Sequence, residues 1–237
     1  MKSSISSFFF GPSLQGGYHD RYKGVPSTEF TMVAFAPCTT GVPYFARKER
    51  EIIKQLFDVG NLFDQIDDVE LVRKAYHTAA TTEMRYRAER GITSVEQVLQ
   101  DTIDTALLLT NAPKSAPGNE EKLKELITGI GQFTHFVFDK KGYKMEDALL
   151  STAKAAYLAA YILKKETGLL QRFDTATFDM KDYLIVHREY NFLNKKVKFV
   201  KGGEALFYWF NTINLLHPPV PAEHTAPTVA GAASKDG

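Results

Sequence analysis

The segment from Asp67 to Leu163 restricts the fold of this chain more than any other part, because its apolar residues recur with the period of an α-helix. Gly91 and Gly142 each mark a point where a polar helix end gives way to a new apolar pattern. The spacing predicts two antiparallel helix pairs joined at residues 111–118, where two prolines interrupt the pattern. We therefore expect a mainly α fold, a helical bundle.

The second helix of the first pair can be aligned in sequence with the second helix of the second pair when a one-residue gap is allowed in the preceding turn. The aligned positions are Val95, Glu96, Leu99, Thr102 and Ala106 against Met145, Glu146, Leu149, Thr152 and Ala156. This spacing corresponds to a period of about fifty residues, near the range of known helical repeats. Two units are few, so both an internal duplication and two independent amphipathic helices fit the pattern.

The chain divides into three regions by composition. Residues 1–42 are interrupted by glycine and proline so often that a helix cannot propagate, which predicts an extended aromatic-rich arm. Residues 43–216 form the predicted helical domain, whose first helix runs from about residue 43 to about residue 57, with Pro43 as its first residue. Residues 217–237 are rich in proline and alanine, which predicts a flexible tail.

The stretch at residues 183–200 has a weaker pattern than the rest of the helical domain. Polar and apolar residues alternate from Lys196 to Phe199, which is typical of a strand. We interpret the stretch either as a short helix or as a short β-hairpin that turns at Asn194 and Lys195.

The composition excludes several classes of protein. The formal net charge of +1 provides no general attraction for nucleic acid or anionic membranes. A single cysteine cannot form an internal disulfide or a cysteine-rich zinc site, and it fits a reducing compartment. The sequence lacks an apolar run of the roughly 18 residues that a membrane-spanning helix needs. We therefore expect a soluble intracellular protein without membrane insertion.

The sequence lacks the motifs of common catalytic sites. There is no glycine-rich phosphate loop, no Gly-x-Ser-x-Gly turn, and no pair of histidines at metal-ligand spacing. We therefore predict neither catalytic residues nor a metal site. An enzyme or a small-ligand-binding protein stays open as an alternative, with an all-α pocket lined by Tyr76, Tyr157, Tyr161 and His135.

A local basic run gives a second alternative. Its cations are Lys181, Arg188, Lys195, Lys196, Lys198 and Lys201, interleaved with Tyr183, Tyr190, Phe192 and Phe199. Aromatic rings and cations together can bind single-stranded nucleic acid by stacking and phosphate contact. A half-buried hairpin with solvated lysines would have the same pattern, and the neutral whole chain makes nucleic acid the less favoured partner.

Aromatic residues suggest where the chain binds protein partners. A free arm would leave its rings exposed, and each ring contributes roughly 1.5 to 3 kcal/mol when it is buried. The arm must therefore pack against its own domain or against a partner, as must the apolar segment at residues 204–216. The candidate partner-binding residues are Phe8, Phe9, Phe10, Tyr18, Tyr22 and Trp209.

Cys38 is the remaining candidate for a functional residue. It lies between Pro37 and Gly41, in a loop context rather than on an apolar helix face. Three interpretations fit this context: an incidental half-buried thiol, a nucleophile without a neighbouring histidine in the sequence, or a covalent anchor for a prosthetic group.

Two motifs resemble a known family. Residues 70–76 (ELVRKAY), followed by residues 91–96 (GITSVE), are similar to the helical linker domains of phycobilisome rods. The arrangement of two helix pairs also resembles the linker-like γ subunits of phycoerythrin, which thread phycobiliprotein hexamers and carry bilins on cysteines. The resemblance implies a non-enzymatic structural subunit that organises a larger assembly of protein subunits. It also implies a covalently bound bilin on Cys38 and a location in the cytoplasm or the plastid stroma.

Overall fold

The computed structural model describes residues 27–111, 118–136 and 142–218, and within this part of the chain the regular structure is helical. Its α-helices are α2 (Ser27–Ala34), α3 (Glu49–Phe63), α4 (Val69–Tyr86), α5 (Val95–Thr110), α6 (Asn119–Phe133), α7 (Met145–Leu163), α8 (Phe192–Val197) and α9 (Glu204–Leu216). Short 3₁₀ helices are η1 (Ala88–Arg90), η2 (Thr134–Phe136), η3 (Met180–Tyr183) and η4 (Val200–Gly203). The prediction of a mainly α bundle is confirmed.

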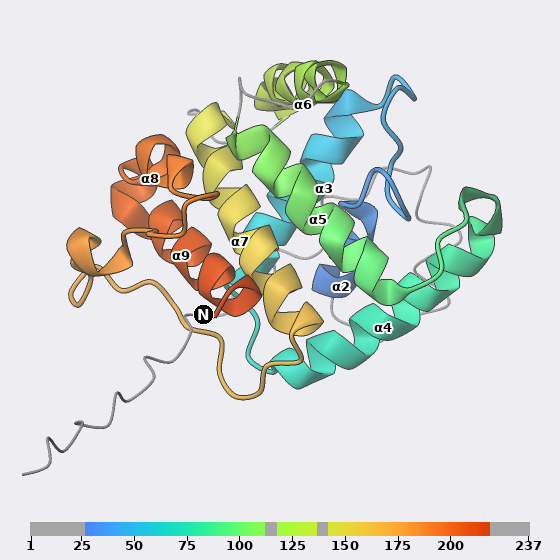
Figure 1. The fold of residues 1–237 in the computed structure, drawn as a ribbon. Helices are drawn as coiled ribbons and strands as arrows, with labels where there is room; N and C mark the ends of the chain where they lie inside the picture. The colour runs from blue at the N-terminus through green and yellow to red at the C-terminus, as the bar shows by residue number, and fades with distance from the viewer. Residues whose placement is uncertain (1–26, 112–117, 137–141, 219–237) are drawn as a thin grey trace, which may run out of the picture.

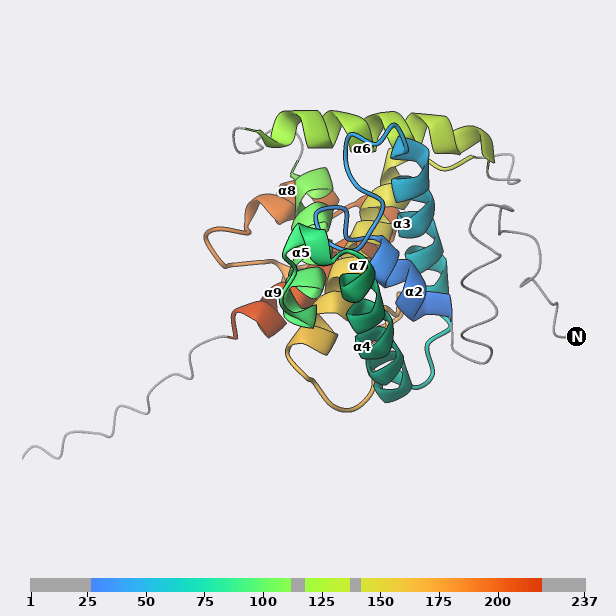
Figure 2. The same cartoon turned by 90° about the vertical axis from the view of Figure 1, so that its right-hand side faces the viewer.

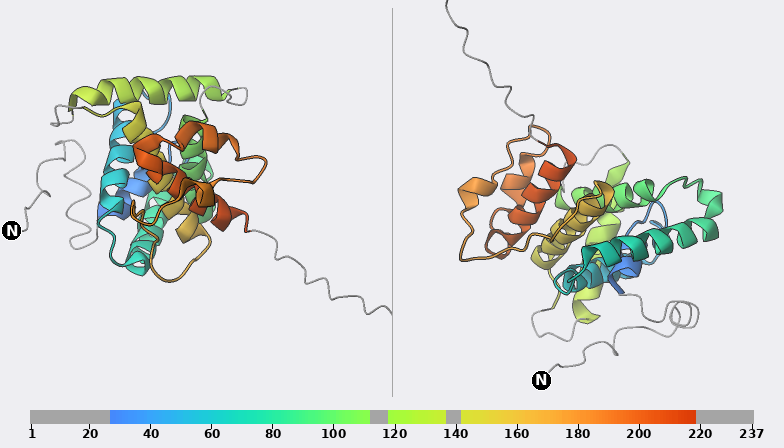
Figure 3. Two further views of the ribbon diagram at one scale, coloured as in Figure 1. Left: turned by 90° about the vertical axis from the view of Figure 1, so that its left-hand side faces the viewer. Right: turned by 90° about the horizontal axis from the view of Figure 1, so that it is seen from below.

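Helix α7 is the central element of the bundle. It packs against α5, α3 and α9, and Figure 1 shows it between α5 and α9. The alanines of α7 allow three helices to pack closely around it, because small side chains let neighbouring helix axes approach. The fully buried alanines of α7 are Ala148, Ala153, Ala155, Ala156, Ala159 and Ala160. Seen from below, the bundle has α9 on one side of α7 and the α4–α5 side on the other (Figure 3).

The helices that are consecutive in the sequence are not the ones that pack most extensively. Helix α5 packs along α7, whereas it touches α4 only over a short length. Helix α6 lies across one end of the bundle, where it packs mainly on α3 (Figures 1 and 2). The periodic pattern identified the apolar face of each helix, but it could not identify the helix that covers that face.

Local capping interactions define the first turns of α4 and α5. The side chain of Asp68 accepts the backbone N–H of Leu71 at the start of α4, and that of Ser94 accepts the N–H of Gln97 at the start of α5. Gly91 ends η1 in the left-handed conformation, with φ of 66°. Pro43, by contrast, does not begin a helix, because α3 starts at Glu49.

The aromatic-rich arm and the hairpin need correction. Residues 27–34 form α2, which packs against α3 and α4, so the described part of the arm belongs to the helical domain rather than to an extended segment. The hairpin interpretation of residues 183–200 is wrong, because this stretch contains the end of η3 and the whole of α8. Asn194, the predicted turn residue, lies inside α8 and binds both the N–H and the C=O of Ile185 with its amide.

Gly129 and Gly131 are expected to respond oppositely to alanine. A Cβ on Gly129 would lie 2.4 Å from the backbone oxygen of Glu49, whereas a Cβ on Gly131 would have no atom within 4 Å. We expect Gly129→Ala to destabilise the protein by about 1–3 kcal/mol through this backbone clash. Gly131→Ala should stabilise it by about 1 kcal/mol, since alanine is the better helix former. Urea denaturation of both variants measures the difference, and equal effects would contradict the close approach of α6 to α3.

Candidate functional site

A cleft opens between α5, the first turn of α6 and the loop that joins α2 to α3. Its volume is about 560 Å³, and Cys38, Tyr44, Asp101, Asp104, Leu108 and Lys122 are among its lining residues. Figure 2 shows this loop next to α5 and beneath α6. The volume falls in the range of sites that bind small organic molecules, roughly 300 to 1,000 Å³.

The carboxylate of Asp101 fixes the loop at the edge of the cleft. Its Oδ2 accepts the backbone N–H groups of Cys38 at 2.8 Å and of Thr39 at 2.9 Å, and the hydroxyl of Thr39 at 2.9 Å. Arg90 donates to the carbonyl oxygen of Thr39 in the same loop. Asp101 is buried, and this burial raises its pKa although the hydrogen bonds act in the opposite direction. The position of Cys38 is therefore set by a buried contact with α5.

The thiol of Cys38 is positioned beside a cation but is not activated. The Nζ of Lys122 lies 3.6 Å from its Sγ. The residue as a whole is exposed, yet its side chain lines the cleft, and burial there, followed by the charge of Asp101, raises the thiol pKa to about 11. Because the thiolate is the reactive form of cysteine, this environment disfavours a nucleophilic role at neutral pH.

Alkylation of Cys38 should follow this raised pKa. We expect the rate with iodoacetamide to rise with pH towards a midpoint near 11, compared with 9.0 for an unperturbed thiol. At pH 8 the folded protein should react roughly 100-fold more slowly than the urea-unfolded chain, since the thiolate fraction falls tenfold per pKa unit. Lys122→Met should slow the folded protein further by removing the neighbouring positive charge. A midpoint near 9 would show that the cleft does not perturb the thiol.

Tyr44 forms an aromatic wall next to this thiol. Its hydroxyl lies 3.5 Å from the Oγ1 of Thr105, and the ammonium of Lys122 lies 5.5 Å from the centre of its ring. Burial raises the pKa of Tyr44, so the phenol is neutral at physiological pH. The cleft thus offers one cation, one aromatic ring, carboxylates and a thiol to a ligand.

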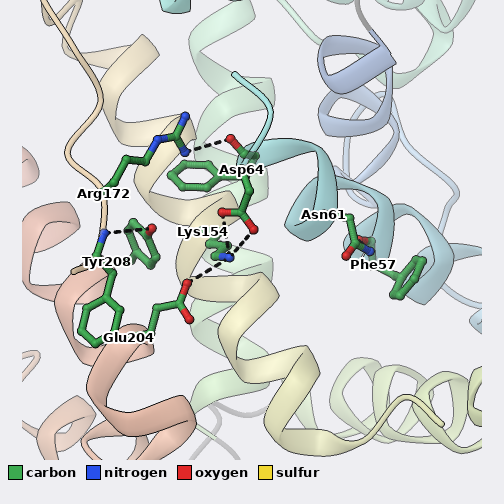
Figure 4. Close-up of polar contacts among 9 residues, drawn as sticks. Phe57, Asn61, Asp64, Lys154, Arg172, Glu204 and Tyr208 are labelled. Atoms are coloured by element: carbon green, nitrogen blue, oxygen red, sulfur yellow. Dashed lines mark hydrogen bonds and ion pairs between the residues drawn. The ribbon is translucent and has the colours of Figure 1, made fainter. Parts of the chain in front are cut away.

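A second polar cluster lies inside the bundle, around Lys154 of α7 (Figure 4). Its ammonium binds both carboxylate oxygens of Asp64 at 2.9 and 2.8 Å and the carboxylate of Glu204 at 3.0 Å. The rings of Phe63 and Tyr208 lie 5.9 and 5.8 Å from the same nitrogen. These contacts join α7 to the C-terminal end of α3 and to the first turn of α9, so we interpret the cluster as structural.

The structure separates the residues that the sequence suggested for binding. Cys38 lies at the cleft, but Trp209 is fully buried, and its Nε1–H has no hydrogen-bond partner among the described residues. Trp209 is therefore a core residue and does not face a partner, because α9 turns this side toward the bundle. Phe8, Phe9, Phe10, Tyr18 and Tyr22 lie outside the described residues.

The tyrosine pocket suggested for an enzyme does not form. Tyr76, Tyr157 and Tyr161 are buried in the hydrophobic core, whereas His135 is exposed in η2. None of the four lines the cleft. These residues match the helical period of the core, so packing accounts for the three tyrosines.

The sequence analysis did not identify Asp101, which holds the loop at the Cys38 cleft, or Lys154, the centre of the polar cluster inside the bundle. Asp101 and Lys154 occupy positions on otherwise apolar faces, and a charge in such a position is a signal of a buried polar contact. That signal marks the residue but not its partner. Asp101 is 63 positions from Cys38 and Lys154 is 90 positions from Asp64, so neither contact is visible as a local motif.

The described residues contain neither a membrane-spanning helix nor a cluster of metal-ligating side chains. No helix in this part of the chain combines the length and apolar character needed to cross a bilayer. Within residues 27–111, 118–136 and 142–218, no three histidine, cysteine, aspartate or glutamate side chains are grouped so that they could hold a metal ion.

The chain has no match among known proteins in three comparisons: no protein-family model, no curated protein sequence and no solved structure is significantly similar to it.

Proposed function

We propose that this chain is a non-enzymatic subunit of a larger protein assembly and that it carries an organic group in the Cys38 cleft. The observation that carries the proposal is the free thiol of Cys38 on the wall of a cleft of about 560 Å³. The linker-like motifs of α4 and α5 favour a bilin as the attached group, bound through a thioether to Cys38.

The lining residues fit a group of this kind. The Sγ of Cys38 supplies the attachment point, and Lys122, 3.6 Å away, supplies a cation for a carboxylate substituent. Tyr44 supplies an aromatic surface, and the carboxylates of Asp101 and Asp104 can accept hydrogen bonds from ring N–H groups. A bound bilin would supply the absorption of visible light, and the chain would supply attachment and orientation.

The packing of the core supports a structural role. Helix α7 is surrounded by α3, α5 and α9, and its central cation is fixed by two carboxylates, so the bundle is a rigid support for surface loops. Several large apolar side chains are exposed on the described surface, and in an assembly we expect some of them to be covered by other subunits. The most exposed of them are Val186, Leu169, Phe199, Phe45 and Tyr86.

The absorption spectrum of protein purified from its source tests the attached group. We expect a visible band that survives acidic urea and is absent from Cys38→Ser. A colourless protein would exclude the bilin. Native mass spectrometry of the same material tests the assembly, because a chain that is isolated alone contradicts the subunit role.

A second candidate function is non-covalent binding of a small molecule in the same cleft. The raised thiol pKa favours it, because an inactive thiol forms a covalent bond slowly. In this case the ligand would be released by urea, and Cys38→Ser would retain it. Lys122→Glu should abolish retention of an anionic ligand, whereas Lys124→Glu, an exposed position on the same helix, should leave it unchanged.

A further inference from the structure

The turn from Tyr44 to Lys48 has an unfavourable backbone conformation. Phe45 has φ of 63° and Arg47 has φ of 58°, although neither residue is glycine. Side chains crowd the backbone in this left-handed region, and bulky residues adopt it only where the surrounding structure imposes it. Burial of the Phe45 ring cannot be the reason, because this residue is 62% exposed.

Glu125 of α6 supplies the constraint. Both of its carboxylate oxygens accept the backbone N–H of Phe45, at 3.0 and 2.8 Å. Glu125 is a buried residue, so the acceptor side of this contact is largely removed from water. A charged acceptor thus fixes a backbone conformation that the turn would not adopt alone.

The turn is continuous with the wall of the cleft. Tyr44, directly before Phe45, lines the cleft together with Cys38. Its only connection to α5 among the described hydrogen bonds is the contact of 3.5 Å between its hydroxyl and Thr105, which is at the limit of a hydrogen bond. A change of φ at Phe45 would therefore break only this weak hydrogen bond to α5, but it would also move the Tyr44 ring away from the edge of the hydrophobic core and from Lys122.

We propose that the Tyr44–Lys48 turn is a strained gate beside the Cys38 cleft and that Glu125 holds it in the closed position, in which Tyr44 lies against the cleft wall as in this structure. Loss of the Glu125 contact allows Phe45 and Arg47 to return to negative φ, and this movement takes Tyr44 away from the cleft wall. The proposal rests on the proposed function only in assuming that the cleft receives a ligand; the movement itself is a property of the chain.

The reactivity of Cys38 with reagents of different size measures whether the gate is open. We would compare its reaction rates with a small and a bulky methanethiosulfonate reagent and use the ratio of the two rates. Both reagents react with the same thiolate, so the ratio is independent of the thiol pKa and reports the space beside Tyr44. Glu125→Ala should raise the bulky-to-small ratio about tenfold, the population shift that relief of one such strained residue can drive.

Two variants serve as matched controls. Glu125→Gln keeps the side-chain length and one acceptor oxygen but removes the charge, so its ratio should lie between those of the wild type and of Glu125→Ala. Arg47→Gly removes side-chain strain at an exposed position that does not line the cleft, so it should favour the closed gate and lower the ratio. Circular dichroism and urea denaturation verify that each variant is folded.

Amide hydrogen exchange keeps the proposal testable if Glu125→Ala does not fold. The Phe45 amide should exchange about tenfold more slowly in Arg47→Gly than in the wild type, because the closed gate protects it. Unchanged exchange in Arg47→Gly, or an unchanged ratio in folded Glu125→Ala, would overturn the gate. Neither measurement requires a ligand, so absence of a bilin would refute only the proposed function.

Discussion

Replacement of Phe35 by alanine is expected to lower the free energy of unfolding by about 3–5 kcal/mol, the usual cost of removing a fully buried aromatic ring. Phe35 follows α2 directly and is completely buried, and its carbonyl oxygen accepts the hydroxyl of Thr102 from α5. The loss combines the transfer of the ring to water with the cavity that remains beside α5. Urea denaturation followed by circular dichroism measures it.

Phe199→Ala is the matched control for this prediction. Phe199 is 74% exposed, so the same substitution should change the stability by less than about 0.5 kcal/mol. If both variants were equally stable, the segment at residues 31–36 would not belong to the core. The comparison therefore decides whether this part of the predicted arm is integral to the domain.

Replacement of Lys154 by alanine should destabilise the protein by about 3 kcal/mol, at the lower end of the range for breaking a buried ion pair. The side chain of Lys154 is only 6% exposed, and its loss leaves the carboxylates of Asp64 and Glu204 without their cation. Asp64 is 49% exposed, so water can solvate part of the uncompensated charge. The partial exposure is the reason for expecting the lower end of the range.

Further variants separate charge from packing at this position. Lys154→Met combined with Asp64→Asn and Glu204→Gln should recover most of the lost stability, because no unpaired charge remains. Lys124→Ala on the exposed face of α6 should change the stability by less than about 0.5 kcal/mol. A loss at Lys154 no larger than at Lys124 would show that the cluster does not join the helices.

The two predictions concern the support on which the cleft depends. Phe35 fixes α2 to the bundle, and Cys38 lies three residues after it, in the loop that Asp101 holds. Lys154 fixes α7, which packs along α5, the helix that carries Asp101. Variants at either position should therefore be compared with the Cys38 alkylation rate, because movement of α5 would change the cleft as well as the stability.

The helical character of the chain and one helix end follow from local patterns in the sequence. Apolar residues at a spacing of three to four, and a glycine such as Gly91 at a helix end, act over a single turn of helix, so they can be recognised locally. Local patterns could not distinguish a strand from a short helix at residues 183–200, because the alternating stretch there has only a few residues. In the structure the stretch contains a short helix, and the side chain of Asn194 binds the backbone N–H and C=O of Ile185, which a neighbouring strand would otherwise bind.

The choice of neighbouring helices and the position of the cleft depend on the folded bundle as a whole. An apolar face is equally able to pack on any complementary face, so the pattern could not distinguish the α5–α7 contact from the expected α4–α5 pair. The contacts of Asp101 with Cys38 and of Glu125 with Phe45 join residues 63 and 80 positions apart. Such contacts depend on the whole bundle bringing two distant backbones within hydrogen-bond distance, which no local spacing encodes.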